Sequence, residues 1–130
     1  MRIHHVGIAV SDLDASIAMY RDVFHAELTH RVASPSEGQE TALMSAGGTE
    51  LELMMPTRED SPVGKFVAKR GPGMHHVAFA VPDIRKALAE ARAAGMQLVD
   101  EEPRTGVHGS PIAFIHPKSA GGVLTELVEE

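Results

Sequence analysis

The chain has 130 residues, a formal net charge of −6 and no cysteine. The missing cysteines exclude disulfides and thiolate metal sites, and the acidic balance argues against a nucleic-acid-binding protein. No apolar run approaches the length of a membrane span, so we expect a cytoplasmic protein that folds as a single domain over residues 1–130.

One ten-residue segment occurs twice. Residues 4–13 (HHVGIAVSDL) reappear as residues 75–84 (HHVAFAVPDI), with six of the ten positions identical. Each copy is short and rich in β-branched residues, ends at a turn signal and precedes a segment with helical periodicity. We therefore interpret the chain as two copies of one module, each too short to bury a good core without the other.

The first module is predicted as β-α-β-β-β over about residues 1–56. Its helix, about residues 12–24, carries an apolar stripe at three- and four-residue spacing: Leu13, Ile17, Tyr20 and Phe24. A polar segment, residues 33–38, is typical of a loop. The remaining strands are predicted near residues 26–32, 39–45 and 49–55.

A linker of about residues 57–73 joins the modules and contains a short helix, with Ser61 as its cap and Pro62 in its first turn. The second module, about residues 74–130, repeats the order of the first. Its helix runs from Asp83 to the stop at Gly95. Its later strands are predicted near residues 97–100, 111–115 and 123–128, with a loop over residues 103–110.

Strand alternation separates the two faces of each repeated segment. One face is bulky and suits packing under a helix, whereas the other carries a histidine followed by small residues: His5, Gly7 and Ala9, then His76, Ala78 and Ala80. A histidine at the start of a strand is often only a partly exposed polar residue. Two at equivalent positions, both beside small residues, indicate instead that His5 and His76 point into a shared cup.

The last strand of each module carries a candidate carboxylate. Glu126 lies in an apolar strand, where an unpaired carboxylate would be costly. In the first module Glu50 and Glu52 share a face, and periodicity does not separate them. A set of two imidazoles and two carboxylates, His5, Glu52, His76 and Glu126, suits Co²⁺, Mn²⁺, Ni²⁺, Zn²⁺ or Fe²⁺. The other six histidines are interpreted as surface or packing residues: His4, His25, His30, His75, His108 and His116. For His108 and His116, a role in the pocket or beside the ligands stays open.

These features resemble the vicinal oxygen chelate superfamily of glyoxalases and bleomycin-resistance proteins, and within it the methylmalonyl-CoA epimerase family. The resemblance covers essentially the whole chain. It is carried by the histidine strands and, more specifically, by the linker and later segments: residues 4–10, 59–66, 69–79, 100–104 and 116–124. It implies an α+β fold in which paired βαβββ modules form a curved eight-stranded cup around a metal site, with outer helices.

The resemblance also implies a ligand set. The two metal histidines of the family fall on His5 and His76, and its fourth ligand falls on Glu126. Its third ligand, often glutamine, falls on Glu52 rather than Glu50, a departure that keeps an oxygen donor and adds charge. An acidic base proposed for some members aligns with Thr41 and is not carried over. A divalent metal ion is implied, with Co²⁺ favoured.

The implied activity interconverts (2R)- and (2S)-methylmalonyl-CoA by proton abstraction at C2 through an enolate, with Glu126 and Glu52 as acid and base. A glyoxalase I-like lactoylglutathione lyase, another metal-dependent enzyme of the superfamily and a bleomycin-resistance-type binding protein remain alternatives. A homodimer is expected by resemblance. Four basic residues are candidates for the CoA phosphates, although a solvated surface role is the more common one for any single residue of this kind: Lys65, Lys69, Arg104 and Lys118.

Overall fold

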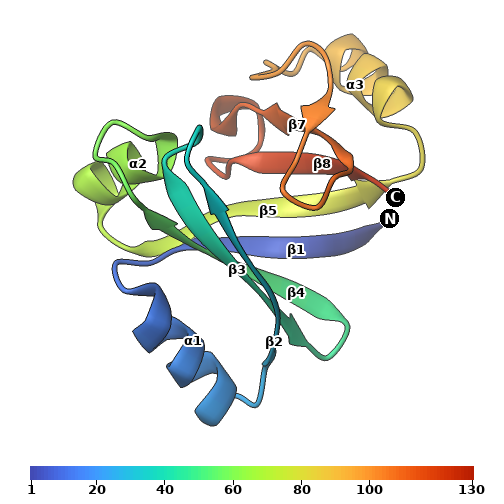
Figure 1. Cartoon of the computed structure of the whole chain (residues 1–130). Coiled ribbons are helices and arrows are strands. Elements are labelled where there is room, and N and C mark those ends of the chain that lie inside the picture. The colour runs from blue at the N-terminus through green and yellow to red at the C-terminus, as the bar shows by residue number, and fades with distance from the viewer. The chain divides into compact units, whose positions relative to one another are not determined.

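The computed structural model describes residues 1–130 and contains eight β-strands and three α-helices (Figure 1). The chain divides into two compact units, His5–His75 and Met1–His4 with His76–Glu130. The α+β class and the repeated β-α-β-β-β order predicted from the sequence are confirmed. No helix is long and apolar enough to cross a membrane. The single-domain organisation stays a prediction.

The unit His5–His75 has the strand order β2-β3-β4-β1. Strands β1 and β4 are parallel, whereas β2, β3 and β4 form an antiparallel meander. The elements are β1 (Arg2–Ala9), α1 (Leu13–Asp22), β2 (Glu27–Ser34), β3 (Gln39–Ala46), β4 (Thr49–Pro56) and α2 (Pro62–Arg70). The predicted bounds of these elements agree to within a few residues.

A two-residue turn joins β3 to β4 and sets the register of β4. Gly47 and Gly48 have φ of 57° and 88°, the positive values that a type I′ turn requires and that glycine adopts without strain. The register places Glu50 opposite His5 and Glu52 opposite Gly7. Because side chains alternate along a strand, all four positions lie on one face.

Helix α1 covers the other face of this unit. It begins after Asp12, whose Oδ1 accepts a hydrogen bond from the backbone N–H of Ala15 at 3.0 Å. Its buried Leu13 and Ile17 pack with Val10, Ala26, Ala42, Met44 and Leu53. The prediction that Phe24 belongs to this stripe is wrong: the helix ends at Asp22, and Phe24 is 64% exposed.

Helix α2 packs on the face that carries His5. Its Val63 forms a buried cluster with Ala9 and Met54, which lie two residues beyond Gly7 and Glu52 on the same face. The cap predicted at Ser61 is confirmed, since its Oγ accepts from Gly64 N at 3.0 Å and donates to the Arg58 carbonyl at 2.7 Å. The His5 face is therefore covered at one end.

The second unit has the strand order β5-β8-β7-β6. Helix α3 packs Ile84 and Leu88 against Val81, Ala113 and Leu127, while a smaller apolar cluster lies on the opposite face: Ala78, Ile112, Val128 and Phe114. The elements are β5 (Gly73–Val81), α3 (Ile84–Ala93), β6 (Arg104–Thr105), β7 (Pro111–Ile115), a 3-10 turn (Pro117–Ser119) and β8 (Thr125–Glu129).

The strand predicted near residues 97–100 is wrong. Leu98 forms an isolated bridge with Ile115, and Val99 N and Asp100 N both donate to the Phe114 carbonyl, at 2.9 Å and 3.2 Å. The regular ladder does not continue, because the Phe114 backbone N–H donates to the Asp100 side chain at 2.8 Å in place of a backbone carbonyl. The second strand of this module is instead the two-residue β6, Arg104–Thr105, within the segment predicted as a loop. It pairs with β7.

Residues near the two chain ends contact each other within this second unit. The Arg2 guanidinium forms an ion pair with the Glu130 carboxylate, which lowers the pKa of Glu130 and raises that of Arg2. His4 Nε2 lies 3.4 Å from Glu130 Oε2. Both Arg2 and Glu130 are exposed, so this pair contributes little to the free energy of unfolding.

We predict that Gly64→Ala destabilises the protein, although alanine is the better helix former. A Cβ at this position would overlap the Arg58 carbonyl oxygen and lie 2.8 Å from that of Glu59. We expect the free energy of unfolding to fall by about 1–3 kcal/mol, the usual cost of overpacking, as measured by urea denaturation. Ala68→Gly, at an exposed position of the same helix, is the control, because it measures the difference in helix propensity between alanine and glycine without a steric clash. Stabilisation by Gly64→Ala would contradict the steric argument.

Candidate functional site

The first candidate pair is His5 on β1 and Glu52 on β4. His5 Nε2 lies 3.2 Å from Glu52 Oε2, and the two residues are 0% and 5% exposed. Glu52 stands opposite Gly7 in the register, and because glycine has no side chain the carboxylate has room to approach His5. The predicted histidine face is thus a real feature of this unit.

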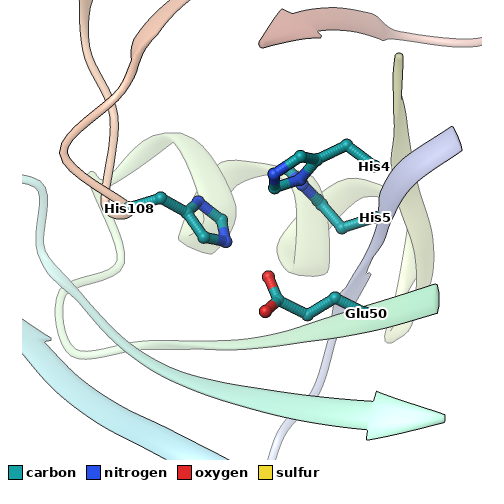
Figure 2. Close-up of side chains that lie close together, drawn as sticks. All are labelled: His4, His5, Glu50 and His108. Atoms are coloured by element: carbon teal, nitrogen blue, oxygen red, sulfur yellow. The ribbon is translucent and has the colours of Figure 1, made fainter. Parts of the chain in front are cut away.

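Glu50, which periodicity left as an alternative, also lies near His5. One of its carboxylate oxygens is within 4.8 Å of a ring nitrogen of His5, and the two side chains approach from neighbouring strands (Figure 2). Glu50 is half-buried, whereas Glu52 is buried. Burial therefore distinguishes two acids that alternation alone could not.

The second candidate pair is His76 on β5 and Glu126 on β8. His76 Nε2 lies 3.0 Å from Glu126 Oε2, and the two residues are 3% and 5% exposed. Glu126 stands opposite Ala78, two residues after the histidine, as Glu52 stands opposite Gly7 two residues after His5. The repeat predicted from the sequence is therefore exact in register at these two positions of each unit.

The donors of each pair fit a divalent metal ion. Ligand atoms that lie about 2.0–2.2 Å from one ion are about 3 Å apart when they occupy adjacent coordination positions. The nitrogen–oxygen distances of 3.2 Å and 3.0 Å match that spacing. Burial of a carboxylate costs free energy unless the carboxylate is paired or coordinates a metal. Both buried glutamates lie beside a histidine nitrogen that could bind the same ion. Each unit thus offers one nitrogen and one oxygen donor.

An aromatic and a charged residue adjoin the second pair. The Phe114 ring contacts the His76 imidazole edge-on, with ring centroids 5.5 Å apart. The Arg104 guanidinium lies over the Phe114 ring, 5.6 Å from its centroid, and its Nε is 3.3 Å from Asp100 Oδ1. Sequence reasoning did not assign Phe114 to the site. Alternation along β7, with Phe114 opposite Glu126, is the signal that could have found it.

The remaining histidines contact aromatic rings, accept a backbone hydrogen bond or lie on the surface. The His4 and His108 rings meet edge-on with centroids 5.0 Å apart (Figure 2), and His75 contacts Phe66. His116 Nδ1 accepts a hydrogen bond from Lys118 N at 3.0 Å, while His25 and His30 are exposed. The candidates for CoA phosphate binding are all exposed: Lys65, Lys69, Arg104 and Lys118.

Thr41, the residue that the family resemblance aligns with a proposed acidic base of some members, is fully buried in β3. Its Oγ accepts a hydrogen bond from the Gln39 side-chain amide at 3.1 Å. Thr41 stands opposite Met54 of β4, and Leu43 stands opposite Glu52. This part of β3 therefore presents a hydroxyl and no carboxylate on the face that carries Glu52.

Residues 4–114 match the family model described as the glyoxalase/bleomycin resistance protein/dioxygenase superfamily. The chain belongs to this superfamily.

Several members that are similar over nearly the whole chain are named epimerases. The ethylmalonyl-CoA/methylmalonyl-CoA epimerase of Cereibacter sphaeroides is 38% identical over 97% of this chain and 96% of its own length. The crystal structure of methylmalonyl-CoA epimerase from Mycobacterium tuberculosis is 43% identical, with a TM-score of 0.92 over 98% of this chain and 86% of that one.

A variant of the Streptomyces coelicolor methylmalonyl-CoA epimerase, solved with 2-nitronate-propionyl-CoA, is also 43% identical, with a TM-score of 0.92 over 100% of this chain and 94% of that one. The superfamily fold expected from the sequence is therefore confirmed.

We predict that Co²⁺ stabilises the chelator-treated protein. A ligand present at 100 times its Kd raises the free energy of unfolding by about 2.7 kcal/mol. For a protein of this size, that increase corresponds to a rise in Tm of about 10 °C. His76→Gln and Glu126→Gln should each abolish most of this rise in differential scanning fluorimetry. His30→Gln, on the exposed surface of β2, is the control and should keep it. An equal rise in wild type and His76→Gln would exclude His76 as a ligand.

Proposed function

We propose that the protein is a methylmalonyl-CoA epimerase, an isomerase that interconverts the (2R) and (2S) forms of its substrate. The observation that carries this proposal is the presence of two buried histidine–glutamate pairs, each with the same register, in a chain whose similar relatives are named epimerases. Inversion at C2 requires a proton to leave one side of the carbon and another to arrive on the opposite side. Two carboxylates supply the acid and the base for that exchange.

We assign His5, Glu52, His76 and Glu126 as the ligands of one divalent ion, with Co²⁺ favoured. Each of these residues is 5% exposed or less, and imidazole and carboxylate donors together suit the later first-row divalent metals. When bound, such an ion supplies electrophilic stabilisation of the negative charge that develops on the thioester oxygen. The extra charge of Glu52, relative to the glutamine frequent in the family, makes this a more anionic donor set.

We assign Glu126 as one base and Glu52, at the equivalent register position, as the other. A carboxylate has two oxygens, so contact of Oε2 with the neighbouring imidazole is compatible with proton transfer at Oε1. Burial of both glutamates limits access of water to the carbanionic intermediate, which protects it from uncontrolled protonation.

Three further features belong to this proposal, and the first of them, the homodimer, rests on the family resemblance alone. The protein acts as a homodimer and works in the cytoplasm. The CoA phosphates bind at a subset of the exposed basic residues Lys65, Lys69, Arg104 and Lys118.

Two other activities found in the superfamily are the alternatives to epimerisation. A lactoylglutathione lyase would turn over the hemithioacetal of methylglyoxal and glutathione, and a bleomycin-resistance-type protein would bind its ligand without proton exchange. The epimerase is favoured because the Cereibacter, Mycobacterium and Streptomyces relatives, at 38–43% identity over nearly the whole chain, are named for that reaction.

We predict that the Co²⁺-loaded protein exchanges the C2 proton of methylmalonyl-CoA with solvent. Proton NMR in D₂O should show loss of the C2 signal, and Glu126→Gln should lower the exchange rate by a factor of about 100 or more, the usual contribution of a general base. Binding of the substrate to Glu126→Gln, measured by calorimetry, should persist. Glu90→Gln on the exposed surface of α3 is the matched control.

Full exchange by Glu126→Gln would contradict its assignment as a base. Absence of exchange in the metal-loaded wild type, with turnover of the hemithioacetal instead, would replace the epimerase by the lyase.

A further inference from the structure

Phe114 is held in one position beside the second histidine–glutamate pair. One edge of its ring meets His76, and the Arg104 guanidinium covers the ring on another side. The Asp100 carboxylate binds both neighbouring residues. Its Oδ1 accepts a hydrogen bond from Arg104 Nε at 3.3 Å, and its Oδ2 accepts one from the Phe114 backbone N–H at 2.8 Å. The ring cannot turn away without breaking contacts to both His76 and Arg104.

The neighbours of Glu126 differ greatly in size on its two sides. In the register of β8, Glu126 stands opposite Ala78 of β5 and opposite Phe114 of β7, and all three share one face. Directly opposite residues have Cβ atoms about 4.5–5.5 Å apart, within contact distance for a phenylalanine ring. Ala78 leaves room beside the carboxylate, whereas Phe114 closes that room on the β7 side.

We propose that Phe114 is a specificity-determining residue that limits the length of the alkyl group at C2 of the substrate. This inference rests on the proposed function, in which Glu126 takes the C2 proton. The carbon must then lie against Glu126, and the alkyl group that it carries lies within reach of the Phe114 ring. On this proposal a methyl group occupies the room that Ala78 leaves beside Glu126, and each further methylene must displace a ring that contacts both His76 and Arg104.

The apolar character of this wall favours an alkyl substituent over a polar one. Phe114 clusters with Ala78, Ile112 and Val128, which are all buried. A hydroxyl or amide at C2 would face this cluster without a hydrogen-bond partner from these four side chains. The substrate class is therefore a 2-alkylmalonyl-CoA thioester with a short alkyl chain.

The test is a comparison of kcat/KM for methylmalonyl-, ethylmalonyl- and propylmalonyl-CoA in wild type and Phe114→Leu. One methylene in an apolar pocket is worth about 10- to 200-fold in discrimination. We expect the ethylmalonyl/methylmalonyl ratio to rise by about tenfold or more in Phe114→Leu, with a further rise for propylmalonyl-CoA. Phe79→Leu is the matched control, since Phe79 is also half-buried on β5 but faces away from Glu126.

The ratio separates a specificity role from a merely structural one, because general loss of stability lowers kcat/KM for all three substrates alike. If Phe114→Leu does not fold, Phe114→Met provides the same comparison with a side chain of more similar volume. An unchanged ratio in a folded variant that epimerises methylmalonyl-CoA would overturn this inference alone. Failure of the wild type to act on any of the three substrates would overturn the proposed function.

Discussion

The contact between a buried carboxylate and an imidazole governs the arrangement of residues in each unit. Glu52 and Glu126 each place a negative charge inside the protein, where it is tolerated only beside a hydrogen-bond donor or a cation. The small residues Gly7 and Ala78 make this contact geometrically possible. Helices α1 and α3 cover the opposite faces and supply the apolar packing that holds the strands in this register.

The two histidine–glutamate pairs have equivalent positions in their units, and this equivalence bears on the proposed reaction. In each unit the acid stands opposite the residue two positions after the histidine. Inversion of a stereocentre needs one group that removes a proton and another that delivers a proton on the opposite side, and these groups exchange roles when the reaction runs backwards. Under the assignment proposed above, the duplicated pair provides two such groups in the same local arrangement. The units differ in their surroundings, where Phe114 adjoins only the second pair among the contacts described.

Much of this arrangement could be predicted because it depends on short-range patterns. The repeat and strand alternation identified His5 and His76, and turn and capping residues located Ser61 and the helix that follows. Alternation could not separate Glu50 from Glu52, which share a face and differ in burial. It also could not place Phe114, Arg104 and Asp100 together, because their contacts depend on how an irregular segment folds back onto β7.

The turn at Gly47–Gly48 carries a consequence for how this protein tolerates insertions and deletions. Glu52 lies four residues beyond the turn, and its face is decided by the pairing of Ala46 with Thr49. A slip of β4 by one residue would bring Leu51 or Leu53 to the histidine and turn the glutamates toward α1. A change in loop length that is harmless in most surface turns would here replace the glutamate beside His5 by a leucine. The chemistry at His5 is thus tied to the length of an exposed hairpin.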